Sequence, residues 1–166
     1  QRPRVVEDAC KDSMRAEGLS PMDQADYLAQ MKSEKVSSQT GGLVLGADQM
    51  LSLEGRGFDK PKSREEAFKR LKEFSGKTHH LECAAVISEN GEAVWRYIAR
   101  PKLTMRRLSD EFINSYLDQI GVAAFESVGA YQLEGLGVQL FSSIEGGYLS
   151  ILGLPGVQIL GYRRRR

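Results

Sequence analysis

Three charged residues lie at positions where the surrounding sequence suggests that they could bind a ligand. Asp48 follows the apolar run of residues 43–47, which predicts a strand that is buried on both faces and ends at this carboxylate. Ligands of open α/β sheets gather at the carboxyl ends of strands. Lys32 continues the apolar stripe of a helix, and Lys60 stands before Pro61. A carboxylate can bind a hard cation or take a proton from water, and lysines can bind anions.

Each of these residues also has an ordinary structural interpretation. Asp48 could cap a turn after the strand, Lys32 could lay its stem along the apolar face, and Lys60 could be a solvated loop charge. Two adjacent histidines, His79 and His80, would point to opposite faces of a strand and could not easily share one metal ion. We expect structural roles for both histidines.

The helices that position these residues are marked by capping signals and glycines. Ser20 before Pro21 predicts a helix that runs to about residue 37 and carries Lys32. Ser63, with Glu66 three residues later, opens a helix that stops at Gly76. A third helix is predicted from the N-cap at residue 109 to the glycine at residue 121.

The strand signals lie between these helices. Residues 80–88 and 93–108 are rich in β-forming residues and flank Asn90-Gly91, so they predict two antiparallel strands joined by a tight turn. Helices and strands therefore alternate irregularly along the chain. We expect an α/β class with a mixed sheet.

Composition excludes several classes of protein. The 166 residues suffice for one domain, and 41% hydrophobic with 27% charged residues is ordinary for a globular protein. Because 23 basic residues nearly balance 22 acidic ones, we expect neither nucleic acid nor membrane as a partner. The two cysteines, Cys10 and Cys83, have no paired spacing and fit free thiols in a reducing cytoplasm.

Several short motifs, in this order and spacing, resemble the Maf family of nucleoside triphosphate pyrophosphatases. They are Leu28-Ala29-Gln30-Met31-Lys32, Gly46-Ala47-Asp48-Gln49, Lys60-Pro61, Ser75-Gly76-Lys77-Thr78-His79, Gly129-Ala130-Tyr131-Gln132-Leu133-Glu134-Gly135, Ile144-Glu145-Gly146 and Gly153-Leu154-Pro155. Each motif is weak alone. Together they extend over nearly the whole chain, so residues 1–166 are interpreted as a single Maf-like domain.

The resemblance implies a fold and a reaction. Members have a mixed α/β sheet flanked by helices around a cleft, similar to inosine triphosphatases, and usually form homodimers. They hydrolyse nucleoside triphosphates to the monophosphate and pyrophosphate with a divalent cation, which implies Mg²⁺ or Mn²⁺ here. The family has been linked to arrest of septum formation.

The resemblance also implies roles for particular residues. Asp48 would be the catalytic carboxylate and a metal ligand, while Lys32 and Lys60 would bind phosphate and converge with it on the cleft. Glu7 would be the acidic residue near the metal, although an acid in the first turn of a helix is favoured by the helix dipole in any case. Glu134 would bind substrate at a position where many members have Gln. Asp48-Gln49 and Glu134-Gly135-Leu136-Gly137 resemble the branch that acts on 7-methyl-GTP.

The two ends of the sequence depart from the family pattern. Members begin with a strand and a Ser-x-Ser-x-Arg-Arg loop that binds the triphosphate, and nothing before Glu7 matches it. Members continue with a leucine-rich helix after Gly-Leu-Pro, whereas residues 156–166 of this sequence end in four arginines. One alternative is therefore a catalytically silent member that binds a nucleotide or a protein partner in the control of cell division. Another is a fragment of an active enzyme, whose activity would rise by orders of magnitude once the loop was restored.

Overall fold

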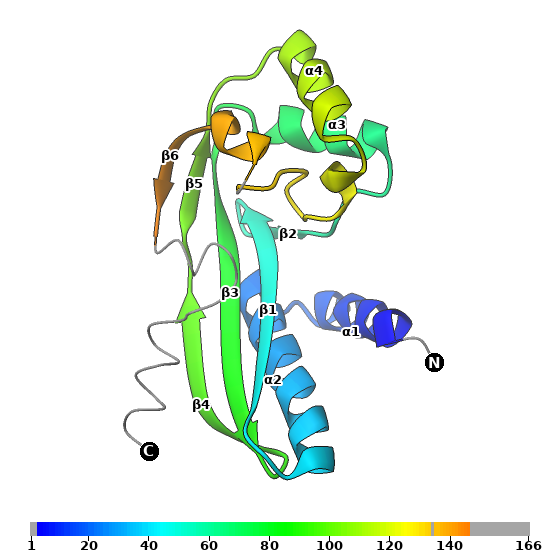
Figure 1. Cartoon of the computed structure of the whole chain (residues 1–166), viewed down its shortest axis with the longest axis vertical. Coiled ribbons are helices and arrows are strands. Elements are labelled where there is room, and N and C mark those ends of the chain that lie inside the picture. The colour runs from blue at the N-terminus through cyan, green and yellow to red at the C-terminus, as the bar shows by residue number, and fades with distance from the viewer. Residues whose placement is uncertain (1–2, 134, 147–166) are drawn as a thin grey trace. The chain divides into compact units, whose positions relative to one another are not determined.

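The computed structural model describes residues 3–133 and 135–146, with side chains from residue 9 onward. The helices are α1 (Pro3–Ala16), α2 (Pro21–Thr40), α3 (Arg64–Phe74) and α4 (Asp110–Ile120), with short 3-10 turns η1 (Gly121–Phe125) and η2 (Leu136–Leu140). The strands are β1 (Val44–Leu53), β2 (Arg56–Phe58), β3 (Thr78–Glu89), β4 (Glu92–Ala99), β5 (Lys102–Met105) and β6 (Phe141–Glu145) (Figure 1). None of the helices in this described part is long and apolar enough to cross a membrane.

The predicted helix starts are confirmed. Ser20, Ser63 and Ser109 each accept a hydrogen bond from the backbone N–H three residues later. Helix α2 extends beyond the predicted end at residue 37, to Thr40. Hydroxyls in its last turn hydrogen-bond to carbonyls three or four residues back, and Gly41 then ends the helix with a φ of 69°.

The α/β class with flanking helices is confirmed, but the sheet is antiparallel where a mixed one was expected. Its order is β2-β1-β3-β5-β6, and β4 pairs with β3 beside this path. The pairs β1–β2, β3–β4, β3–β5 and β5–β6 are all antiparallel. A tight turn can join only antiparallel strands, which explains the antiparallel pairing of β1 with β2 and of β3 with β4.

Two strand predictions were wrong in their bounds. β1 continues past Asp48 to Leu53, so Asp48 lies in the middle of the strand, and Leu45 is 40% exposed where burial on both faces was expected. The strand ends instead at Glu54-Gly55, where both residues have positive φ, and β2 returns along it. The run of residues 93–108 also divides at Pro101, which has no N–H to donate, so β4 and β5 pair with successive parts of β3. The predicted Asn90-Gly91 turn is confirmed.

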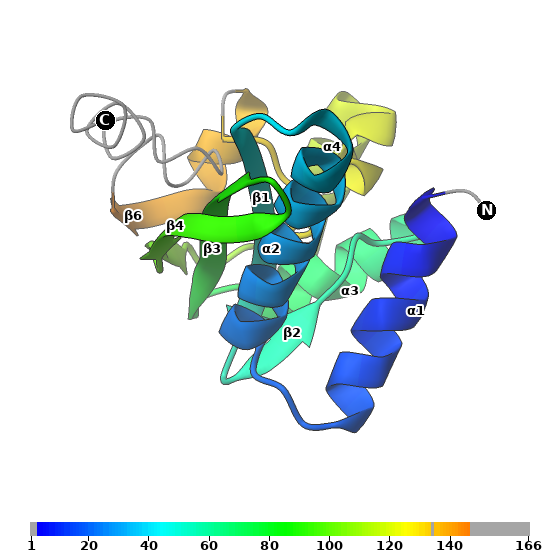
Figure 2. The ribbon, with the colours of Figure 1, turned by 90° about the horizontal axis from the view of Figure 1, so that it is seen from below.

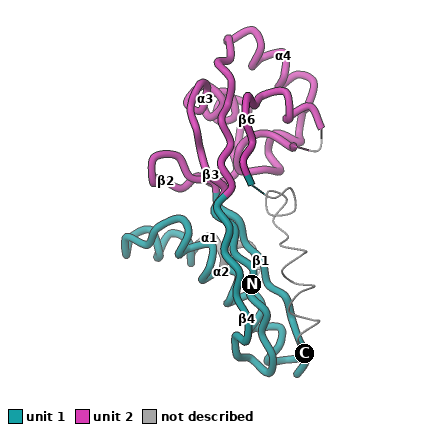
Figure 3. The backbone as a smooth tube through the Cα atoms, turned by 90° about the vertical axis from the view of Figure 1, so that its left-hand side faces the viewer, with its two compact units in different colours: residues 1–50, 82–100, 146–166 teal, residues 51–81, 101–145 magenta. Residues whose placement is uncertain are grey.

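The chain forms two compact units (Figure 3). Unit 1 comprises residues 1–50, 82–100 and 146–166, and unit 2 comprises residues 51–81 and 101–145. Strands β1 and β3 contribute residues to both units. The single domain over residues 1–166 stays a prediction.

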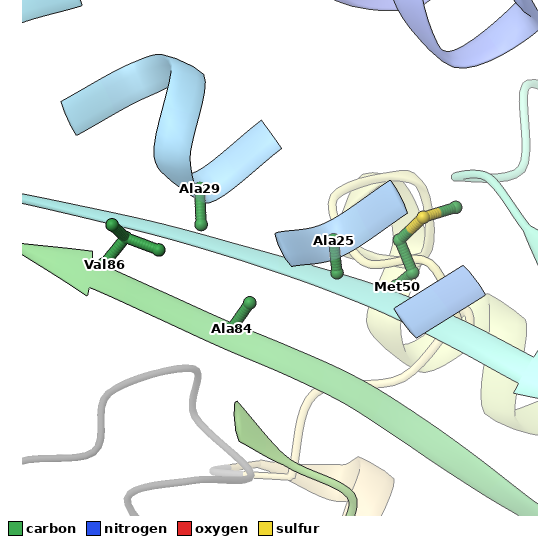
Figure 4. Close-up of a cluster of buried hydrophobic side chains, with 5 residues drawn as sticks. All are labelled: Ala25, Ala29, Met50, Ala84 and Val86. Atoms are coloured by element: carbon green, nitrogen blue, oxygen red, sulfur yellow. The ribbon is translucent and has the colours of Figure 1, made fainter. Parts of the chain in front are cut away.

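In unit 1, helix α2 packs on the sheet face formed by β1, β3 and β4 (Figures 1 and 2). The small side chains of Ala25 and Ala29 meet Met50, Ala84 and Val86 in a buried cluster (Figure 4). Because alanines leave little volume between helix and sheet, the backbone of α2 lies close to the strands. This close packing determines which polar groups of α2 reach β1.

In unit 2, α3 and α4 pack against each other. Their buried side chains form the core of this unit with strand and loop residues: Ala67, Leu71, Phe74, Leu103, Met105, Ile113, Tyr116, Leu117 and Leu140. Phe74 also contacts Phe58 edge to face, with ring centroids 5.0 Å apart. The contact joins the end of β2 to α3, on either side of the loop that carries Lys60.

Candidate active site

The centre of the candidate site is an ion pair between α2 and β1 in unit 1. The ammonium Nζ of Lys32 lies 2.6 Å from Oδ1 of Asp48. The Asp48 side chain is 8% exposed and that of Lys32 is 36% exposed. A nearly buried carboxylate is thus neutralised by a cation that still reaches solvent.

Gly46 explains why the pair forms. A Cβ at this position would lie 2.2 Å from the Ala29 carbonyl oxygen and 2.8 Å from the Ser33 nitrogen, so only glycine allows α2 to come this close. Gly46 and Asp48 are two residues apart on a strand and therefore face the same side, toward α2. Lys32 adjoins the buried Ser33 in the same turn of the helix, and the close approach brings its ammonium to Asp48.

Hydrogen bonds hold α2 in this position along its length. The hydroxyls of Ser33 and Ser88 lie 2.7 Å apart in the core, and the N–H of Gly91 donates to the Ser37 hydroxyl at 2.9 Å. At the other end of the helix, Arg96 of β4 forms an ion pair with Asp26. Helix and sheet are therefore locked together on both sides of Lys32, which limits how far the ion pair can move.

The polar residues next to Asp48 are structural. Gln49 donates to the sulfur of Cys83 at 3.1 Å, and burial raises the pKa of this thiol to about 11, so it stays protonated at neutral pH. Glu82 is buried, and Nε of Arg100 donates to both of its oxygens, at 2.9 and 3.1 Å. We therefore do not expect Cys83 to act as a nucleophile.

Lys60 lies in unit 2, between β2 and α3, and its side chain is exposed. The backbone that carries it is fixed on both sides. Arg70 donates to the carbonyl of Asp59 at 2.7 Å, and Glu66 accepts from the N–H of Lys62 at 2.8 Å. Three residues were expected to converge, and the structure brings two of them together, Lys32 and Asp48. The approach of Lys60 to this pair stays a prediction.

The two other expected site residues have less structural detail. Glu7 is in helix α1, but the first turn of that helix contains no acidic residue, so the interpretation of Glu7 as a first-turn acid is wrong. The side chain of Glu7 and the whole of Glu134 lie outside the described residues. Their roles in metal and substrate binding stay predictions.

His79 is buried and His80 is only half-buried, as expected for neighbours on a strand. His79 is fully buried in unit 2, and its Nε2 forms a 2.7 Å hydrogen bond with the hydroxyl of Tyr131. Burial lowers the pKa of His79 to about 4, so it is neutral at physiological pH. Among the described side chains, those of residues 9–133 and 135–146, no group of three or more His, Cys, Asp or Glu is placed to hold a metal ion.

A comparison with protein families identifies the family of the chain. A model of the family described as Maf-like protein matches residues 1–164. The chain belongs to the Maf-like family. The resemblance drawn from the motifs is thereby confirmed, and the motifs that contain Lys32, Asp48 and Lys60 lie within the matched region.

Individual members of the Maf-like family match nearly the whole chain. A protein of Hyphomonas neptunium named nucleoside triphosphate pyrophosphatase is 51% identical over 164 residues, which cover 99% of this chain and 83% of that protein. A Jannaschia protein named nucleoside triphosphate pyrophosphatase 1 is 48% identical, covering 98% of this chain and 83% of that protein. A nucleoside triphosphate pyrophosphatase of Caulobacter vibrioides is also 48% identical, and the match covers 98% of this chain and 81% of that protein.

The sequence alone did not identify Gly46 as the residue that controls the site. The signal was present, because a glycine inside a strand often marks a close backbone approach. Gly46 was instead taken as part of an apolar run. The structure shows that Gly46 determines how close Lys32 comes to Asp48.

Proposed function

We propose that this chain is a nucleoside triphosphate pyrophosphatase, which hydrolyses its substrate to the nucleoside monophosphate and pyrophosphate. The observation that carries the proposal is the Lys32–Asp48 pair, in which a nearly buried carboxylate is held at 2.6 Å by a partly exposed cation. The names of the relatives support the same reaction. Such a pair offers both a proton acceptor and positive charge for a phosphate oxygen.

The two side chains have separate tasks in the reaction. Asp48 orients a water molecule and accepts its proton as the water oxygen bonds to phosphorus. The bond from that phosphorus to the bridging oxygen breaks, and pyrophosphate leaves. Lys32 holds the Asp48 carboxylate in place. The solvent-exposed part of the Lys32 ammonium faces the phosphate oxygens and stabilises the negative charge that spreads over them in the transition state.

Asp48 suits a divalent cation of the hard type. Mg²⁺ binds one or two carboxylates, keeps several waters and takes substrate phosphate oxygens, so a cage of protein ligands is not needed. We propose that Asp48 holds Mg²⁺ or Mn²⁺ together with the substrate, with Glu7 as a second carboxylate. The cation would supply charge neutralisation at the phosphates.

The remaining parts of the proposal concern the substrate and the cell. Lys60 binds the phosphate chain, and Glu134 contacts the substrate beyond it. The substrate is a nucleotide such as 7-methyl-GTP, and the enzyme works in the cytoplasm, where thiols such as Cys83 stay reduced. We further propose a homodimer and a connection to cell division, as the resemblance implies.

The decisive experiment measures pyrophosphate and monophosphate release from 7-methyl-GTP, GTP, dTTP and UTP with Mg²⁺ or Mn²⁺. Equal amounts of the two products are expected. In ¹⁸O-labelled water, attack at the α-phosphorus places the label in the monophosphate. The Asp48→Asn variant is the matched control, since it keeps the shape of the side chain and removes the proton acceptor.

Three results would contradict the proposal or a part of it. Release of inorganic phosphate in place of pyrophosphate would mean that a different bond is broken. Nucleotide binding by calorimetry without any product would favour the catalytically silent alternative. Activity that survives unchanged in Asp48→Asn would remove Asp48 from the reaction while leaving the chemistry to other residues.

A further inference from the structure

Arg70 of α3 is a half-buried cation whose hydrogen bonds go to backbone carbonyls. Its Nη1 donates to the carbonyl of Asp59 at 2.7 Å and also to the carbonyl of Val128. Its guanidinium lies over the ring of Phe58, 4.8 Å from the centroid. Burial lowers the pKa of Arg70, although the group remains charged at neutral pH. Desolvating a cation is costly, and the contacts of Arg70 with these two carbonyls offset that cost.

The first carbonyl belongs to the loop that carries Lys60. Asp59 immediately precedes Lys60, and the next residue, Pro61, is buried. The far side of this loop is fixed by Glu66, which accepts from the N–H of Lys62 at 2.8 Å. With both sides of the loop held from α3, the exposed Lys60 side chain extends from a fixed point of the backbone.

The second carbonyl belongs to a strained segment 58 residues away in the sequence. Val128 precedes Gly129, whose Cβ, if it had one, would lie 2.1 Å from the ring of Tyr131. Ala130 has a φ of 58°, a left-handed conformation that is costly for a residue other than glycine. Ser127 accepts from the N–H of Tyr131 at 3.1 Å and so closes this turn.

We propose that Arg70 is a positioning residue, which holds the Lys60 loop and residues 128–133 in the single arrangement that binds the triphosphate. One planar guanidinium joins the two loops within unit 2, and α3 supplies the rigid support. Arg70 acts through Lys60 and does not itself contact the substrate. The inference rests on the proposed function, because Lys60 has its role only if a triphosphate binds.

Arg56 provides a matched control for the test. Its guanidinium also lies over the Phe58 ring, at 4.6 Å, and it forms an ion pair with Glu73. Arg56→Met therefore removes a charge and a stacking contact from the same ring but leaves both carbonyl contacts of Arg70. Arg70→Met removes those contacts, and Arg70→Lys keeps the charge with a single flexible donor group.

We expect Arg70→Met to raise KM for the nucleotide roughly tenfold with a smaller change in kcat, Arg70→Lys to be intermediate, and Arg56→Met to stay within about twofold. Circular dichroism checks that all variants are folded. In a Lys60→Ala background, Arg70→Met should have little further effect on KM, because its influence passes through Lys60. A purely structural role would raise KM equally in both backgrounds, and that result would overturn the inference, as would equal KM values for Arg70→Met and Arg56→Met.

The same variants separate this inference from the proposed function. If the unsubstituted chain releases no pyrophosphate, the proposed function fails, and affinity for an α,β-methylene nucleoside triphosphate is measured by calorimetry instead. Weaker binding in Arg70→Met than in Arg56→Met would then support the positioning role, and equal binding would overturn it. A chain that neither hydrolyses nor binds the nucleotide would overturn both proposals.

Discussion

Replacing Gly46 by alanine should disrupt the Lys32–Asp48 pair without touching either residue. The added Cβ would lie 2.2 Å from the carbonyl oxygen of Ala29 and 2.9 Å from the Cβ of Ser33. A carbon–oxygen contact of ordinary length is more than about 3 Å, so the α2 backbone must move by roughly 1 Å. The nearest atoms belong to the helix backbone, so no side-chain rotation can relieve the contact.

The expected effects follow from that displacement. Overpacking of a core costs about 1–3 kcal/mol, and in a chain of this size each kcal/mol lowers Tm by roughly 2–4 °C. A displacement of about 1 Å at a catalytic group can reduce turnover by about a hundredfold. Gly46→Ala should therefore unfold several degrees lower and lose most of its pyrophosphatase activity.

Gly42→Ala is the matched control for this substitution. No atom would lie within 4 Å of a Cβ at Gly42, and its φ is not in the left-handed region. Thermal unfolding by circular dichroism and pyrophosphate release would be measured for both variants. If Gly46→Ala matched Gly42→Ala in both measurements, close approach of α2 to β1 would not be what assembles the site.

Three further predictions concern single side chains. Asp48→Asn should remain folded by circular dichroism and lose at least about a hundredfold in kcat, because the amide cannot accept the proton; retained turnover would contradict the assigned role. Lys32→Met should destabilise the fold by about 1–3 kcal/mol in urea unfolding, since the nearly buried Asp48 carboxylate loses its partner, and an unchanged urea midpoint would argue against the ion pair. The buried His79 has a pKa of about 4 against an ordinary 6.5, so the unfolded state binds the extra proton between these values and stability should fall as pH drops from 6.5 toward 4, by on the order of 3 kcal/mol. His79→Gln should flatten this dependence in urea unfolding at pH 7 and pH 5, and an equally steep loss in that variant would show that other groups cause it.

The parts of the fold that the sequence predicted well depend on local chemistry. Serine N-caps need only the backbone N–H groups of the next turn, and Asn90-Gly91 needs only its own positive φ angles, so both were recognised from short stretches. The errors involve contacts between distant residues. Polar residues after residue 47 suggested a strand end, yet β1 continues because its later residues pair with β2 and pack in the core.

In the candidate site too, local sequence signals were predicted well and contacts between distant residues were not. Residue types and motifs selected Lys32 and Asp48, but nothing in a separation of 16 residues predicts a 2.6 Å contact. That contact depends on the close approach of α2 at Gly46, which is a property of the packed structure. Arg70 could not be recognised at all, since a charged residue on a helix is ordinarily solvated and its two carbonyl partners lie 11 and 58 residues away.

The charge of the described pair determines what else the site requires. Lys32 and Asp48 together carry no net charge, so the pair can position water but cannot neutralise a triphosphate by itself. Positive charge must come from other groups that meet the same phosphates. On the proposed function, Lys60 would supply one such charge from a loop whose backbone is fixed by Arg70 and Glu66, and a divalent cation at Asp48 would supply more. If both contribute, loss of Lys60 should raise the Mg²⁺ concentration needed for half-maximal activity, whereas independent roles would leave that concentration unchanged.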